Sequence, residues 1–174
     1  MLLDFSVEQL RHISNTSLWI IMDPWKDQQL MLDGTDTKSY ELPINQWNDI
    51  YMQKIFKHMQ IMKNKIVVID DIKKSPNFLK TSLWISHGNS NGFSILNNFM
   101  RERNLDSIIY CGFHEQMCIV NRPLGYNNML SRYNCYIEQN LTCPFPTQNW
   151  KEEQLRQRTD KEYKYIDMLS IEKQ

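Results

Sequence analysis

The sequence lacks the features that define several protein classes. Its 20 basic and 20 acidic residues cancel, whereas a general nucleic-acid-binding protein or a polybasic membrane anchor normally carries a basic excess. No apolar run approaches the ~18 residues that a membrane-spanning helix needs. The first residues also lack the charged segment and small-residue cleavage site of a signal peptide. We therefore expect a cytoplasmic protein that binds neither nucleic acid nor membrane.

Cysteine is scarce, and alanine is absent altogether. The four cysteines (Cys111, Cys118, Cys135 and Cys143) are too few for a disulfide scaffold in a chain of 174 residues, and no Cys-x-x-Cys pair suggests a zinc ribbon. Asn, Ile, Lys and Met are abundant, which is typical of an AT-rich genome such as that of a virus or phage. We expect free thiols in a single domain over residues 1–174, with one hydrophobic core.

Short apolar runs alternate along the chain with segments of helical periodicity. The predicted strands cover 17–22, 66–69, 83–85, 107–111 and 135–137. The predicted helices cover 45–63, 92–103, about 119–133 and 150–171. This alternation is typical of βαβ units and indicates a doubly wound, mostly parallel, Rossmann-like α/β sheet with helices on both faces.

Three reactive side chains follow predicted strands. Asp23 ends the first strand, His87 follows the strand over 83–85, and Cys118 follows the strand over 107–111. Each has an ordinary explanation: Asp-Pro is common turn chemistry, a loop histidine is usually solvated, and most cysteines are small buried hydrophobes. In a parallel sheet, however, all three would meet at the carboxyl edge, where ligands bind. A thiol, an imidazole and a carboxylate together could perform nucleophilic catalysis.

Three segments carry a family resemblance. The run from Ile108 to Ile119 is similar to an apolar strand followed by Gly-Val-x-Thr-x-x-Cys-Val. The run from Asn121 to Gly125 is similar to an Arg-Pro-Phe-Gly-like continuation after the cysteine. The run from Trp19 to Asp23 is similar to a strand that ends in a catalytic aspartate. In these segments the sequence resembles the isochorismatase-like cysteine hydrolases. The similarity extends over roughly residues 17 to 145.

The resemblance implies a three-layer αβα fold around a six-stranded parallel sheet. It also implies a Cys–Asp–Lys triad that cleaves an amide-type C–N bond of a small molecule through a thioester or, in other members of the family, a vinyl ether. By position, Cys118 would be the nucleophile and Asp23 the proton acceptor, and the backbone around His114 and Cys118 would form the oxyanion hole. A cis peptide bond would fall at Phe113–His114.

The sequence departs from the family pattern at three positions. The place of the lysine is taken by His87, and the motif threonine is Glu115, whose charge would oppose ionisation of the nearby Cys118 thiol. Pro123 interrupts the helix that follows the cysteine. His87 is either a substitute, giving a Cys118–His87–Asp23 triad, or a sign of lost catalysis. The alternative to an active hydrolase is an inactive small-molecule-binding or protein-interaction module on the same fold.

The remaining expectations concern the pocket and the partners. The metal-binding Asp-x-His pattern of the nicotinamidase branch is missing, so we expect no metal and no cofactor. Members of this fold commonly self-associate, which predicts a homo-oligomer, and the amphipathic helix over 150–171 would either serve that contact or cover the sheet. The side chains that would either line the substrate pocket or simply pack are Trp25, Trp84, His114, Glu115 and Tyr126.

Overall fold

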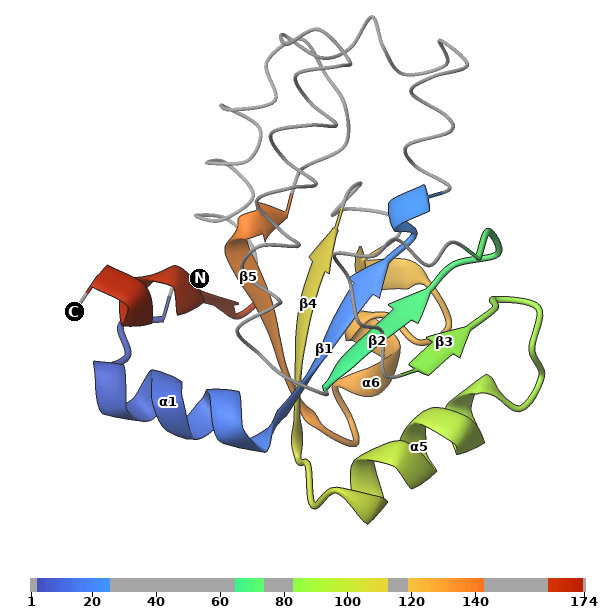
Figure 1. Ribbon diagram of the computed structural model, residues 1–174, viewed down its shortest axis with the longest axis horizontal. Coiled ribbons are helices and arrows are strands. Elements are labelled where there is room, and N and C mark those ends of the chain that lie inside the picture. The colour runs from blue at the N-terminus through green and yellow to red at the C-terminus, as the bar shows by residue number, and fades with distance from the viewer. Residues whose placement is uncertain (1–2, 26–64, 74–82, 113–118, 143–162, 174) are drawn as a thin grey trace, which may run out of the picture.

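The computed structural model describes residues 3–25, 65–73, 83–112, 119–142 and 163–173 (Figure 1). These ranges contain every strand and helix that Figure 1 labels. The predicted helix over 45–63, the first part of the predicted C-terminal helix and the predicted cis bond at Phe113–His114 lie outside them.

A six-stranded sheet forms the centre of the molecule (Figure 1). Its order is β3-β2-β1-β4-β5-β6, and every pairing is parallel. The strands are β1 (Ser17–Met22), β2 (Ile66–Ile69), β3 (Leu83–Ile85), β4 (Ser107–Gly112), β5 (Asn134–Thr142) and β6 (Tyr165–Ile166). The predicted doubly wound α/β sheet is therefore confirmed.

Strand β1 lies in the middle because its side chains are apolar on both faces. All six of its residues are buried, as expected for a parallel strand covered on either side. The chain leaves β1 toward β2 and β3, then returns to place β4 on the other side of β1. The strand order thus reverses between β1 and β4, and this reversal is the point where α/β sheets generally bind ligands.

Helices cover both faces of the sheet, so the predicted three layers are confirmed (Figure 1). Helix α1 (Val7–Thr16) and the 3-10 helix η4 (Met168–Lys173) pack on one face through Leu10, Ile13 and Met168. Helices α5 (Gly92–Glu102) and α6 (Tyr126–Met129) cover the other face. Among the helices of the described ranges, none combines the length and the hydropathy of a membrane span.

The prediction of a helix over 150–171 is wrong at its C-terminal end. Tyr165 and Ile166 are fully buried in β6, and η4 follows from Met168. The charged, helix-like pattern of the tail therefore does not extend to its end, because the Tyr-Ile pair completes the sheet edge beside β5.

The segment after Cys118 also differs from one predicted helix. Residues 120 and 121 are helical, residues 122–125 form a turn, and α6 begins at Tyr126. Pro123 accounts for the break because it has no N–H to donate to the preceding turn. The Tyr110 hydroxyl instead donates to the Leu124 carbonyl at 2.7 Å, which satisfies one of the backbone groups that the break exposes.

Candidate active site

Asp23 lies at the carboxyl end of β1, where the strand order reverses. Its N–H donates to the Ile69 carbonyl at 2.8 Å, and its φ of 52° lies in the left-handed region, which aspartate tolerates better than most residues. Pro24 and Trp25 then begin a helical turn, a favoured place for proline. The sharp change of direction after Met22 leaves the Asp23 carboxylate fully buried at the strand end.

Both carboxylate oxygens of Asp23 have a charged or ionisable partner. Oδ1 lies 2.6 Å from His87 Nε2, and Oδ2 accepts from Arg122 Nε at 3.0 Å. A buried carboxylate is costly unless it is paired and hydrogen-bonded, and these two contacts meet that requirement. The arginine favours the ionised form of Asp23, so Asp23 accepts a hydrogen bond from each neighbour.

His87 is held at this position by the strand ends beside it. Asp71 follows β2, and its Oδ1 accepts from the His87 N–H and from the Ser86 hydroxyl, both at 3.0 Å. Because His87 Nε2 donates to Asp23, Nδ1 of a neutral imidazole is the nitrogen that can accept a proton. The His87 side chain is 10% exposed, so it lies at the boundary between the core and the surface.

Gly112 ends β4 directly beside the end of β1. It pairs with Met22, has a φ of +131°, and a Cβ at this position would lie 2.7 Å from the Met22 carbonyl oxygen. A side chain is therefore excluded on both steric and conformational grounds. This explains the motif glycine: the backbone of β4 must approach the residue before Asp23 closely.

Three of the predicted site residues lie outside the described ranges. Cys118, His114 and Glu115 belong to residues 113–118, which follow Gly112 at the carboxyl end of β4. The structure thus brings Asp23 and His87 together, and the place of Cys118 in a triad stays a prediction.

The two described thiols are poor nucleophile candidates. Cys111 is fully buried in β4, and burial, with a smaller contribution from the Glu138 charge, raises its pKa well above the usual value. Burial raises the pKa of Cys135 to about 12, although the Lys164 charge opposes the rise. Neither thiol ionises readily near neutral pH, so both serve as packing residues.

The predicted pocket walls that the structure describes are packing residues. Trp25 is buried in the core beneath α1, and Trp84 packs partly buried against the same cluster, with Lys73 Nζ 5.1 Å from its ring centroid. Tyr126 is 1% exposed on the opposite face, and its hydroxyl accepts from the Lys164 N–H at 3.0 Å. The structure thus shows the packing role of these three side chains, and a role in lining the substrate pocket stays a prediction.

Two residues with a clear place in this site are absent from the sequence-based prediction. Asp71 carries a usable signal, because it follows a buried strand just as Asp23 does. Arg122 lies in the run that resembles the family's Arg-Pro-Phe-Gly-like continuation, but that resemblance gives no contact with Asp23, which lies 99 positions away. Only the folded sheet brings Asp71 and Arg122 to the Asp23–His87 pair.

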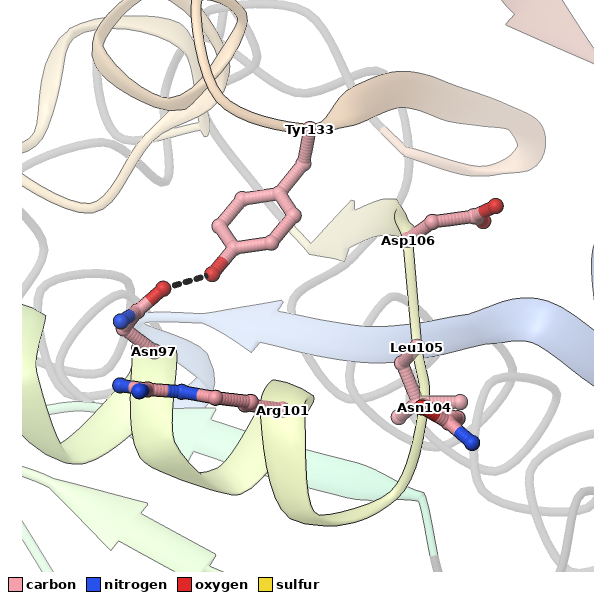
Figure 2. A pocket seen from close by; sticks show the side chains of 6 residues that line it. All are labelled: Asn97, Arg101, Asn104, Leu105, Asp106 and Tyr133. Atoms are coloured by element: carbon pink, nitrogen blue, oxygen red, sulfur yellow. Dashed lines mark hydrogen bonds between the residues drawn. The ribbon is translucent and has the colours of Figure 1, made fainter.

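The opposite end of the sheet has a hollow of about 380 Å³ (Figure 2). It lies where β4 and β5 begin, and the Tyr133 hydroxyl hydrogen-bonds Asn97 across it. Its lining residues are Asn97, Arg101, Asn104, Leu105, Asp106 and Tyr133. The hollow is therefore separate from the Asp23 site.

Within the described ranges, no three His, Cys, Asp or Glu side chains group as metal ligands, and the absence of a metal stays a prediction.

The fold is similar to that of solved isochorismatase-like proteins. A nicotinamidase from Staphylococcus aureus matches 88% of this chain and 99% of its own, with a TM-score of 0.57 and 11% sequence identity. An isochorismatase family protein from Burkholderia thailandensis matches 91% of this chain and 95% of its own, with a TM-score of 0.50 and 10% identity. No family model and no curated protein matches the sequence. The isochorismatase-like fold implied by the sequence resemblance is therefore confirmed.

Proposed function

We propose that this protein is a cysteine hydrolase that cleaves an amide-type C–N bond of a small molecule. The observation that supports the proposal most strongly is the 2.6 Å contact between buried Asp23 and His87 at the strand reversal of an isochorismatase-like sheet. The similar structure from Staphylococcus aureus is by its name an amidase. Cys118 follows the adjacent strand end and would be the nucleophile.

The contacts of Asp23 favour His87, rather than the aspartate, as the group that transfers protons. Both Asp23 oxygens are engaged, whereas His87 keeps Nδ1 for proton transfer. Asp23 would then orient the imidazole and stabilise its charged form, as the carboxylate does in Ser–His–Asp triads.

The reaction would proceed in two balanced halves. His87 takes the Cys118 proton, the thiolate attacks the amide carbon, and the backbone around His114 and Cys118 stabilises the oxyanion. His87 returns the proton to the leaving nitrogen as the C–N bond breaks, which gives a free amine or ammonia and a thioester. Water, deprotonated by His87, then attacks the thioester, and the carboxylic acid leaves as the Cys118 thiol is reprotonated.

Thiol labelling tests the nucleophile without knowledge of the substrate. The intact protein is treated with iodoacetamide from pH 5 to 9, and the site of modification is found by mass spectrometry. We expect fast single labelling with an apparent thiol pKa below about 7.5, since catalytic thiols are more acidic than free cysteine. Cys118→Ser should abolish it. Cys143→Ser is the matched control and should leave it unchanged. Cys111 and Cys135 should not be labelled, because burial raises the pKa of both thiols.

A panel of small amides, followed by hydroxylamine trapping, then tests for the thioester on Cys118. His87→Asn should slow acylation, whereas Cys143→Ser should not. If Cys118 instead titrates near about 8.5, the value for free cysteine, and forms no acyl adduct, the hydrolase proposal fails. The inactive binding or interaction module would then be the better description.

A further inference from the structure

The Arg-Pro-Leu-Gly run over 122–125 has no role in the proposed reaction. We propose that Arg122 is a positioning residue: its guanidinium holds Asp23 aimed at His87, offsets part of the Asp23 negative charge, and supplies the fixed positive charge that a lysine would otherwise bring to the site. The functional consequence rests on the proposed hydrolase activity, whereas the electrostatic part concerns only the contact among the three side chains.

The contact itself is specific. Arg122 Nε lies 3.0 Å from Asp23 Oδ2, on the oxygen that His87 does not use, and the Asp23 side chain is fully buried. The Arg122 side chain is 29% exposed, so the pair is largely shielded from solvent on the aspartate side. Arginine keeps its charge at all accessible pH values, which makes it a permanent partner for the carboxylate.

The turn that carries Arg122 is held from several directions. The Arg122 carbonyl accepts from the Gly125 N–H at 2.7 Å and from Asn128 Nδ2 at 2.8 Å. A Cβ at Gly125 would lie 2.7 Å from the Ile119 carbonyl oxygen and 2.9 Å from that of Arg122, so the tight turn requires glycine. Pro123 breaks the helix at this place. The run therefore fixes the backbone from which Arg122 reaches Asp23.

The charge balance around His87 gives this arrangement a measurable consequence. Two further carboxylates lie at this sheet edge: Asp70 accepts from the Trp25 and Ile72 N–H groups, and Asp71 accepts from Ser86 and His87. Asp23 is the carboxylate that contacts the imidazole, and Arg122 offsets its charge. Without the arginine, the full negative charge of Asp23 acts on His87, and the pair binds its proton more tightly.

For the proposed hydrolase, that tighter binding would be harmful. A protonated His87 cannot take the Cys118 proton, so activity would begin only at higher pH. Arg122 thus offsets the Asp23 charge beside the imidazole while it also fixes the orientation of Asp23. A purely structural role in holding the turn would not move the titration of His87.

The test is an NMR titration of the histidine rings in the wild type and two variants, with His87 assigned from the spectrum of His87→Gln. Arg122→Gln should raise the His87 midpoint by about one pH unit, because the variant removes a nearby positive charge that disfavours the protonated imidazole. Arg122→Lys keeps the charge and should leave the midpoint within about 0.3 unit of wild type, well below that one-unit effect. Arg103→Gln, which removes a charge from the end of α5, is the matched control and should change nothing.

Two outcomes overturn the proposal. The first is a folded Arg122→Gln variant with an unchanged His87 midpoint. The second is an Arg122→Lys variant whose His87 midpoint rises by about one pH unit, the shift expected for loss of the charge. The second outcome decides the question even if Arg122→Gln fails to fold.

The titration needs no turnover, so it separates this proposal from the hydrolase. An unreactive Cys118 would refute the hydrolase and leave the role of Arg122 testable. A reactive Cys118 with an unmoved His87 would refute only the role of Arg122. In an active enzyme, Arg122→Gln should move the acid limb of kcat/KM upward with the His87 midpoint.

Discussion

Glu138 gives the most quantitative prediction, because its carboxylate is fully buried beside the end of the chain. Its Oε1 accepts from the Asn140 N–H and side-chain amide, at 2.7 and 2.9 Å, and its Oε2 accepts from the Met168 N–H at the start of η4. Burial raises the pKa of Glu138 from 4.5 to about 7, and the nearby Asp167 charge adds to the rise, while the N–H donors oppose it.

The sign of the pH effect follows from this raised pKa. Between pH 4.5 and about 7 the folded protein holds the Glu138 proton more tightly than the unfolded chain does, so the free energy of unfolding falls as pH rises. At 1.36 kcal/mol per pKa unit, the loss is about 3 kcal/mol, complete above about pH 7. Glu138→Gln removes the ionisation and should remove this loss, although its amide N–H₂ cannot accept the bond from Met168.

Urea denaturation followed by tryptophan fluorescence, at intervals from pH 4.5 to 8, measures the effect. The difference in unfolding free energy, wild type minus Glu138→Gln, should fall by about 3 kcal/mol across this range. Glu102→Gln, at an exposed position, is the matched control and should show a flat difference. A flat difference for Glu138→Gln, or one that rises with pH, would refute the reasoning.

Two further predictions concern the strand β4 and can be checked by the same denaturation assay. Gly112→Ala should lower the free energy of unfolding by at least about 2 kcal/mol, since the new Cβ meets the Met22 carbonyl at a positive φ. A neutral result would show that the strand ends can separate freely. Tyr110→Phe should cost about 1–3 kcal/mol because the buried Leu124 carbonyl loses its donor, and a smaller cost would mean that another donor replaces it.

The buried strands were predictable because each is a short apolar run covered on both faces, and the observed bounds of β1 and β2 match the predicted ones. Helix α1 was not predicted, although its sequence contains a signal. Ser6 accepts from the Gln9 N–H, and the Gln9 side chain accepts from the Ser6 N–H, which is a capping box. The helix predicted at the end of the chain was wrong for another reason. Tyr165 and Ile166 form a strand because they pair with the edge of the sheet at β5, and their local sequence does not show this pairing.

The site was predictable only as far as strand ends could be located. The sheet-edge rule brings Asp23 and His87 together from the sequence alone, although they lie 64 residues apart. The same rule cannot assign the orientation of side chains. It therefore left Trp25 and Tyr126 as either pocket or packing residues, and the structure shows both buried in the core clusters. The contact between Arg122 and Asp23 depends on the direction in which the turn at Pro123 points the arginine side chain, and no periodicity in the sequence encodes that direction.

The position of β1 has a consequence for how the protein folds. Its partners β2 and β4 pair with it only after long stretches of chain: Ser17 lies opposite Ser107, and Trp19 opposite Ile66. Every described strand pair is parallel, so none closes as a local hairpin, and such topologies fold slowly. During synthesis the apolar segment Leu18–Met22 leaves the ribosome long before β4 exists. We therefore expect overproduction at low temperature, or with chaperones, to raise the yield of folded protein by protecting this one strand from aggregation.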